Sequence, residues 1–188
     1  MPFRRMQERR RREQGAHALY TAIIEQSRLP IFYMKAAVPD TLDGRFDLIV
    51  LHAFMVMRRL GLVSEARVGE ARALSQALFD LMFDDMDQNL RELGVGDMSV
   101  GKKVKQMAQA FYGRVAAYED GLNADDAALR EALLRNLYGT LGAAVAPSVL
   151  AAMAAYLRRQ VTELVGQDEA AVLGGLAVFS GLEEFNDA

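Results

Sequence analysis

The sequence predicts an all-α fold, a single domain of about seven or eight helices. Apolar residues recur at spacings of three and four along most of the 188-residue chain, which is the pattern of amphipathic helices. Hydrophobic residues make up 52% of the chain and charged residues 25%, with only four prolines, a balance typical of a soluble helical protein. No segment shows the regular alternation of a half-buried strand. The absence of cysteine excludes disulfides and thiolate metal sites.

The first elements are separated by proline and by turn-forming residues. Residues 16–28 continue an arginine-rich start into an amphipathic helix. Pro30 begins a short helical segment, because proline fits the first turn of a helix but not its interior. Turn formers then fill residues 38–44, where Thr41 or Asp43 can cap the helix that follows.

Two longer helices come next. Residues 45–62 are almost continuously apolar, and the length of this run and its lack of alternation favour a buried helix over a strand. Gly61 marks its end. A second long helix is expected over residues 65–93, with Gly94 as its stop.

The rest of the chain predicts four more helices. The first covers residues 100–118 and is stopped by Gly121. The sequence NADD then starts a helix over 123–137, because aspartate and asparagine are favoured caps. A proline starts the next helix, over 147–165, and an apolar helix over 167–181 completes the fold.

The two ends of the chain differ from the region between them. We expect a basic, flexible head over residues 1–13, an all-α domain over 14–182 and a short acidic tail over 183–188. The head has six arginines against two glutamates, whereas the whole chain has a net charge of −3. Such a head can contact phosphates on RNA, including those of a ribosome, or an anionic membrane surface, and no DNA partner is expected. Its arginines are Arg4, Arg5, Arg9, Arg10, Arg11 and Arg12.

The sequence contains no targeting or membrane-spanning signal. A secretory signal needs an apolar core behind its basic residues, and the first 30 residues contain none. The longest apolar runs fall short of the roughly 20 residues that span a bilayer. We therefore expect a soluble or peripheral protein.

The helix pair over residues 79–118, joined by a glycine-rich corner, has polar faces of opposite charge. These faces either help the pair to fold or form an exposed recognition surface. We expect Asp87 to pair with Arg91 and some aspartate–lysine pairs to close the hairpin. The other charged residues of the two faces are Asp80, Asp84, Asp85, Lys102 and Lys105.

Two catalytic interpretations of this pair lack residues that they need. Residues 96–102 match the glycine spacing of a phosphate-binding loop, but a helix precedes them and Lys103 replaces the required serine or threonine. Asp80, Asp84 and Asp87 resemble the carboxylates with which all-α isoprenoid synthases hold magnesium, but no second acidic cluster matches them. A small magnesium-dependent enzyme acting on a diphosphate is therefore the alternative to a non-catalytic binding protein without cofactor or metal.

The remaining candidate residues favour binding over catalysis. Two histidines without cysteine cannot build a zinc site, and His52, in the apolar run, is expected to be buried and hydrogen-bonded. Ten methionines either fill a helical core or form a surface that accepts varied apolar partners.

Two blocks of sequence resemble a known family. They are Pro39–Leu60 (PDTLDGRFDLIVLHAFMVMRRL) and Phe79–Arg114 (FDLMFDDMDQNLRELGVGDMSVGKKVKQMAQAFYGR), with a similar lead-in at Ile23–Tyr33 (IIEQSRLPIFY). The blocks resemble the ubiquinol–cytochrome c chaperone family in its alphaproteobacterial form. The resemblance covers residues 20–122, and beyond it only helical composition is shared.

The resemblance implies a non-catalytic, all-α chaperone for assembly of the cytochrome bc1 complex (complex III) of the respiratory chain. Its client would be nascent or newly inserted cytochrome b, and mitochondrial members act near the ribosomal tunnel exit with a small partner protein. Mitochondrial members also have a presequence and a longer N-terminal region, and this sequence shows neither feature. We therefore expect a bacterial cytoplasmic protein, peripheral at the cytoplasmic face of the inner membrane.

Cytochrome b, as the implied client, suggests a role for the charged helix pair. Its cytoplasmic loops are basic and its helices apolar, so the aspartates would face the loops while neighbouring residues contact helix ends. The candidate client-binding residues are Asp80, Asp84, Asp85, Asp87, Lys102, Lys105, Phe111 and Tyr112.

Overall fold

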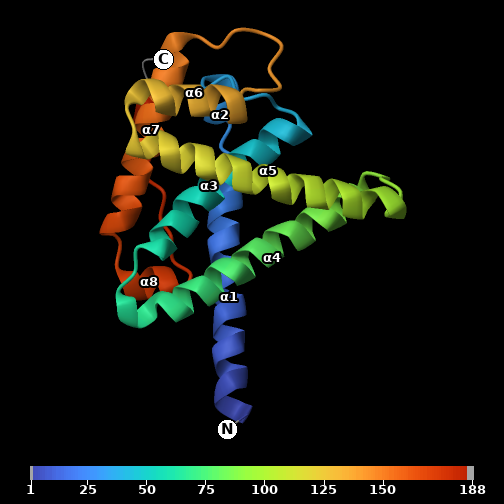
Figure 1. Cartoon of the computed structure of the whole chain (residues 1–188), viewed down its shortest axis with the longest axis vertical. Coiled ribbons are helices and arrows are strands. Elements are labelled where there is room, and N and C mark those ends of the chain that lie inside the picture. Colours follow the sequence, from blue (N-terminus) through green and yellow to red (C-terminus); the bar gives the residue numbers. More distant parts are fainter. Residues whose placement is uncertain (1, 186–188) are drawn as a thin grey trace.

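The computed structural model describes residues 2–185, which contain eight α-helices and two 3-10 turns and no strand (Figure 1). The predicted all-α class is confirmed. Across these residues no helix has the length and hydropathy needed to cross a membrane. The helices are α1 (Pro2–Ser27), α2 (Ile31–Met34), α3 (Leu42–Gly61), α4 (Val68–Glu92), α5 (Asp97–Asn123), α6 (Asp126–Asn136), α7 (Pro147–Gly166) and α8 (Glu169–Leu173). The 3-10 turns are η1 (Glu65–Arg67) and η2 (Glu183–Phe185).

Helix α3 forms the centre of the molecule. Fourteen of its 20 residues are buried, and it packs against α1, α4, α5 and α7. The hydroxyl of Thr41 accepts a hydrogen bond from the backbone N–H of Gly44 at 3.1 Å, which caps the helix start. The predicted buried helix is therefore confirmed, and Thr41 is its cap.

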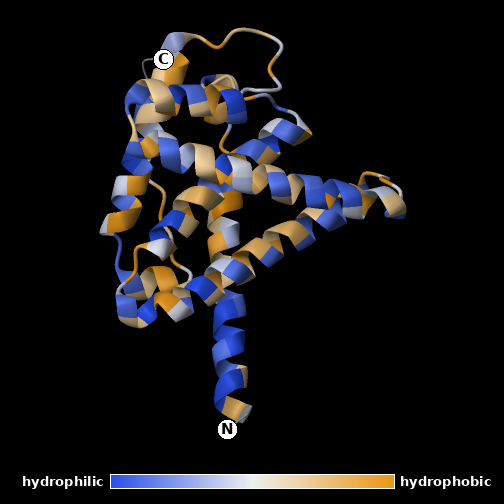
Figure 2. Ribbon diagram, in the orientation of Figure 1, coloured by the Kyte–Doolittle hydropathy of each residue, from blue (hydrophilic) through white to orange (hydrophobic). Residues whose placement is uncertain are grey.

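Helix α1 has a core half and a projecting half. Leu19 is fully buried, whereas residues 3–14 are exposed and the projecting half is hydrophilic along most of its length (Figure 2). The sequence predicts a separate flexible head over residues 1–13, but in the structure the helix passes through residue 13 without a break. Residues 3–14 contain neither proline nor glycine, and Arg9 pairs with Glu13 one turn later at 2.7 Å.

Helices α4 and α5 form a hairpin whose closed end projects from the body (Figure 1). Gly94 turns the chain with a φ of 80°. Arg91 pairs with Asp87 at 2.5 Å, as predicted, and also with Asp97 at 2.6 Å across the corner. The predicted aspartate–lysine pairs are absent from the described residues, so Arg91 closes the hairpin instead.

Gly121 does not stop α5, contrary to the prediction. The helix continues to Asn123. A Cβ atom on Gly121 would lie 2.9 Å from the Cα of Leu129, so the missing side chain lets α6 pack closely against α5.

The predicted helix over residues 167–181 ends early. Helix α8 stops at Leu173, and Gly175 takes a left-handed φ of 101°. The backbone N–H of Leu176 then bonds the carbonyl of Ala171 at 3.0 Å, which is the hydrogen bond that follows a glycine helix stop. The apolar periodicity continues past this point, but the glycine pair overrides it.

The predicted acidic tail is docked in its described part. Phe185 is fully buried, with its ring centroid 6.2 Å from that of Tyr156. Glu184 pairs with Arg159 of α7 at 2.5 Å. Residues 186–188 of the predicted tail lie outside the described residues.

Candidate functional site

The predicted aspartates on α4 do not converge on one point. Asp80 accepts a hydrogen bond from Gln76 at 2.7 Å, and Asp87 is paired with Arg91. Asp84 is exposed and has no hydrogen bond or ion pair within the described residues. In residues 2–185 no group of three or more histidine or carboxylate side chains is placed to hold a metal ion. The arrangement provides surface charge.

Asp85 has a structural role that the sequence did not reveal. Its carboxylate accepts hydrogen bonds from the hydroxyl of Tyr20 at 2.7 Å and from the amide of Asn89 at 3.0 Å. Burial of Tyr20 and its bond to Asp85 raise the pKa of the phenol. Asp85 therefore joins α4 to α1 through Oδ2, the oxygen that accepts both bonds.

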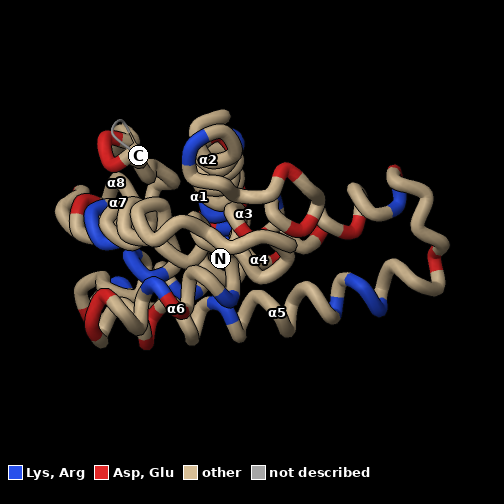
Figure 3. Tube along the Cα trace, turned by 90° about the horizontal axis from the view of Figure 1, so that it is seen from above, with Lys and Arg blue, Asp and Glu red and all other residues tan. Residues whose placement is uncertain are grey.

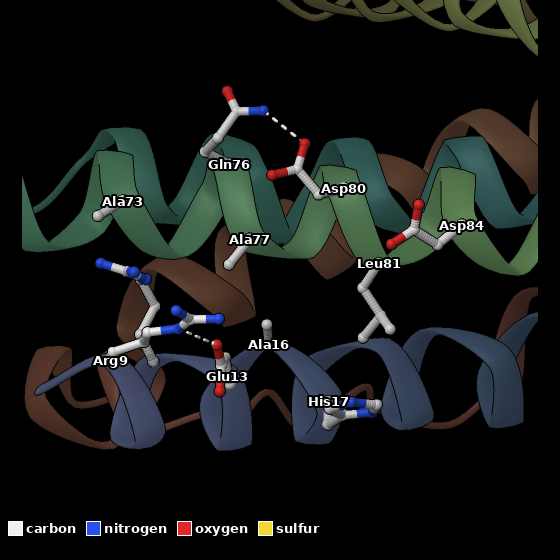
Figure 4. Close-up of a pocket in the computed structure, with 11 residues that line it drawn as sticks. Arg9, Glu13, Ala16, His17, Ala73, Gln76, Ala77, Asp80, Leu81 and Asp84 are labelled. Atoms are coloured by element: carbon white, nitrogen blue, oxygen red, sulfur yellow. Dashed lines mark hydrogen bonds and ion pairs between the residues drawn. The ribbon is translucent and has the colours of Figure 1, made fainter. Parts of the chain in front are cut away.

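Asp80 and Asp84 border a polar pocket of about 640 Å³ between α1 and α4. Figure 4 shows Arg9 on α1 near Ala73 and Gln76 of α4, with the two aspartates farther along α4 on the same pocket. Arg12 also lines the pocket. The acidic face of α4 thus shares a pocket with part of the basic half of α1, whereas the sequence pattern suggested the lysines of α5.

The predicted residues on α5 separate into a surface set and a core residue. Lys102 and Lys105 are exposed on the outer part of the helix (Figure 3). Tyr112 is 60% exposed. Phe111 is only 2% exposed and packs between α4 and α5, so it is inaccessible to a partner in this structure.

A larger groove, with a more apolar lining, lies where α1, α2, α3 and α4 meet, and we call it the four-helix groove. Its volume is about 820 Å³. Phe46 and Met86 form part of its buried lining, and Leu42 is exposed at its edge. Met34 and Leu93, which are 81% and 64% exposed, also border it. It can accept apolar side chains.

The four-helix groove has charged residues of both signs. Arg28, Asp85 and Glu92 line it, and Asp40 pairs with Arg45 at 2.7 Å. An apolar lining with mixed charges suits a segment in which an apolar stretch meets a polar one.

The sequence reasoning missed this groove because its walls are far apart in the chain. Residues 23–33 supply the end of α1 and α2, residues 39–60 supply α3, and residues 79–114 supply the outer part of α4. These are the three stretches that resemble the chaperone family. Their resemblance to the family was the one signal in the sequence that could have pointed to this groove. Only the fold shows that the three stretches meet.

His52 lies in the core, away from this groove. It is fully buried, and its pKa is lowered to about 4 by burial. Its ring nitrogens contact the carbonyl of Leu48 and the hydroxyl of Tyr156, each at 2.8 Å. The predicted buried, hydrogen-bonded histidine is confirmed.

Comparison with known sequences identifies relatives across most of the chain. The model of the ubiquinol-cytochrome C chaperone family matches residues 34–179. Ubiquinol-cytochrome-c reductase complex assembly factor 1 of Xenopus laevis is 29% identical over 171 residues, which are 90% of this chain and 82% of that protein. The Mus musculus factor is 27% identical over 150 residues, which are 80% of this chain and 49% of that protein. This chain therefore spans about half the length of the mouse protein.

A solved structure agrees with these relatives. The crystal structure of the Cbp3 homolog from Brucella abortus matches with a TM-score of 0.81 and 32% identity, covering 98% of this chain and 97% of that one. The family match includes α3 to α7 in full and most of the walls of the four-helix groove. The chain therefore belongs to the ubiquinol-cytochrome c chaperone family.

Proposed function

We propose that this chain is a non-catalytic chaperone for assembly of the cytochrome bc1 complex and that newly made cytochrome b is its client. Family membership supports the chaperone role, and the frog and mouse relatives are named as assembly factors of the ubiquinol-cytochrome c reductase complex. Cytochrome b is the client that the family resemblance implies, and its apolar helices and basic loops fit the groove and the acidic face.

The observation that carries this proposal is the convergence of the three family-like stretches on the four-helix groove. An apolar helix end of the client would fill the groove beside Phe46 and Met86, and Met34 and Leu42 would contact it from the edge. The charges at the edge would meet the polar residues that follow such a helix end. The groove is thus the proposed site of capture.

The acidic face of α4 is proposed to meet the basic loops of the same client. Asp84 is the most available carboxylate, followed by Asp80, because Asp85 and Asp87 already have partners within the chain. Exposed charges of this kind set the rate and orientation of encounter more than the final affinity.

The projecting basic half of α1 is proposed to hold the chaperone where its client is made. This half of α1 extends away from the body (Figure 1), and the ribosome or the anionic cytoplasmic face of the inner membrane offers the phosphates that its arginines would bind. This placement makes the protein cytoplasmic and peripheral to the membrane.

The function is tested by deleting the gene and then restoring either the wild-type chain or a groove variant. The variant M34D/L42D places two carboxylates on exposed apolar positions of the groove. We expect deletion to remove the b-type signal from the reduced-minus-oxidised spectrum of membranes while cytochrome oxidase is unaffected. The variant should restore little of that signal and co-purify less cytochrome b.

Matched controls separate the function from the site. V178D, at an exposed apolar position away from the groove, should behave as wild type, and all variants should keep the wild-type melting temperature. A deletion strain with a normal b-type signal would contradict the chaperone function. Full rescue by M34D/L42D would contradict only the groove as the capture site.

A further inference from the structure

Helix α5 has an exposed face that the other described elements leave largely open, although Tyr112 at its inner end stacks on Phe79 of α4. Met98, Lys102, Lys105, Gln109 and Tyr112 follow one another at spacings of three and four, so they lie along one side of the helix. All five are exposed, and Met98 at the corner of the hairpin is 99% exposed. We call this the outer face of α5.

The lysines at this end of the hairpin have no partner among residues 2–185. Lys102, Lys103 and Lys105 are exposed and form no hydrogen bond or ion pair within the described residues. Residues 91–105 contain four cations against two carboxylates, although the whole chain has a net charge of −3. Figure 3 shows the lysines on the outer part of α5.

The carboxylates of this region are occupied. Asp97 is paired with Arg91 at 2.6 Å, and Glu92 accepts a hydrogen bond from Gln88 at 3.0 Å. Glu92 keeps its charge because its donor is a neutral amide, but three lysines outnumber it, so the end of the hairpin is net positive, which fits an anionic partner.

The apolar residues of the corner lie on a convex end of the molecule. Met98 and Leu93 are exposed there, and Figure 1 shows the corner away from the other helices. A convex apolar corner with cations beside it cannot enclose a partner. It is suited to insert into a deformable surface.

The hairpin is braced so that this end is held in place. The rings of Phe79 and Phe83 lie 4.5 Å apart, and Phe111 of α5 contacts both at 5.4 and 6.0 Å. Edge-to-face and tilted aromatic contacts of this kind join the two helices where they enter the body. The outer face is thus present before any partner arrives.

We infer that the outer face of α5 rests on an anionic phospholipid bilayer. Met98 and Leu93 would enter the boundary between headgroups and acyl chains, and the lysines would meet lipid phosphates while their apolar stems lie along the membrane. Tyr112 would lie at the interface farther along the face. This surface is distinct from the arginines of α1. Its binding to a membrane does not rest on the proposed chaperone function.

A single tryptophan tests the insertion directly, because the chain has none. M98W should show blue-shifted emission with vesicles of phosphatidylcholine and phosphatidylglycerol, but not with phosphatidylcholine alone, and salt should reverse the shift. M34W is the matched control, because Met34 is also highly exposed but lies at the four-helix groove. Its emission should not change.

A charge-reversal pair tests the lysines in vesicle flotation. K102E/K105E should reduce the fraction bound to anionic vesicles by on the order of tenfold or more. The matched variant R10E/R11E changes the projecting half of α1 instead. An unchanged M98W spectrum with anionic vesicles, or wild-type flotation of K102E/K105E, would overturn the inference. Lost cytochrome b capture by K102E/K105E without vesicle binding would assign the face to a protein.

Discussion

At the scale of single residues, a chain of buried hydrogen bonds fixes the position of His52. The carbonyl of Leu48 can only accept, so Nδ1 of His52 carries the proton and Nε2 accepts from the hydroxyl of Tyr156. That hydroxyl in turn accepts from the side-chain amide of Gln26 at 3.0 Å. The chain joins α3, α7 and α1 through a neutral imidazole.

The neutral state of His52 predicts a pH-dependent contribution to stability. Its native pKa is lowered to about 4, whereas an unfolded histidine titrates near 6.5. Between these values the unfolded state binds more protons, so stability falls as the pH falls from about 6.5 to about 4. The free energy of unfolding of wild type minus that of H52Q should therefore decrease by about 3 kcal/mol as the pH falls across this window.

Urea unfolding of both proteins near pH 7 and near pH 4 measures this difference. Other titrating groups, including Asp47, whose pKa burial raises to about 7, are common to both proteins and cancel in the comparison. H17Q replaces the other histidine, which is exposed, and serves as the matched control. A constant difference between wild type and H52Q would show that His52 is not held neutral.

At the scale of the helices, local signals predicted where most elements begin. Thr41 and Asp125 cap α3 and α6 as expected, and Pro147 starts α7. Each of these residues acts through the backbone of its own first turn. Both partners of each interaction therefore lie within a few residues in the sequence, and these helix starts were predicted correctly.

Glycines were predicted less well because their role depends on distant neighbours. Gly94 ends α4 as expected, but Gly121 lies inside α5 and makes room for Leu129 of α6. Gly175 ends α8 although apolar periodicity continues. A helix stop and a close helix contact both favour glycine, and only the packing distinguishes them.

The candidate site was predicted only in part for a related reason. Sequence spacing correctly put charged residues on the surfaces of α4 and α5, but it could not place Arg9 and Asp80 on one pocket or bury Phe111. The four-helix groove depends on four helices that meet only in three dimensions. Periodicity describes one helix at a time, so contacts between helices remain outside its reach.

The docked end of the chain gives a prediction at this scale. Phe185 is fully buried against Phe32 and Tyr156, so F185A should lower the free energy of unfolding by about 3 kcal/mol. V178A, at an exposed position, should change it by less than about 0.5 kcal/mol. Urea unfolding measures both, and equal effects would mean that η2 contributes nothing to the core.

At the scale of the whole molecule, the charges are arranged in separate regions. The arginines of α1 project at one end, the acidic face of α4 borders the polar pocket, and the unpaired lysines lie at the hairpin corner (Figures 1 and 3). The four-helix groove has both signs. A chaperone with this arrangement can meet anionic surfaces with two regions and a basic client with a third.

The acidic region gives the last prediction, which rests on the proposed client. In D80K/D84K the carboxylates that would attract basic loops of cytochrome b become cations, so capture should slow by on the order of tenfold at low salt. The difference in capture between D80K/D84K and wild type should narrow as the salt concentration rises, because salt screens the charges of both proteins. Co-purification of cytochrome b at several salt concentrations measures this effect.

The design must exclude an effect on the fold, because the new lysines would share the pocket with Arg9 and Arg12. The neutral variant D80N/D84N avoids this repulsion and should show a smaller loss of capture in the same direction. E131K changes an exposed carboxylate on α6 and should capture as wild type. Wild-type melting temperatures together with undiminished capture by D80K/D84K at low salt would remove the acidic face from the client-binding surface and leave the groove alone.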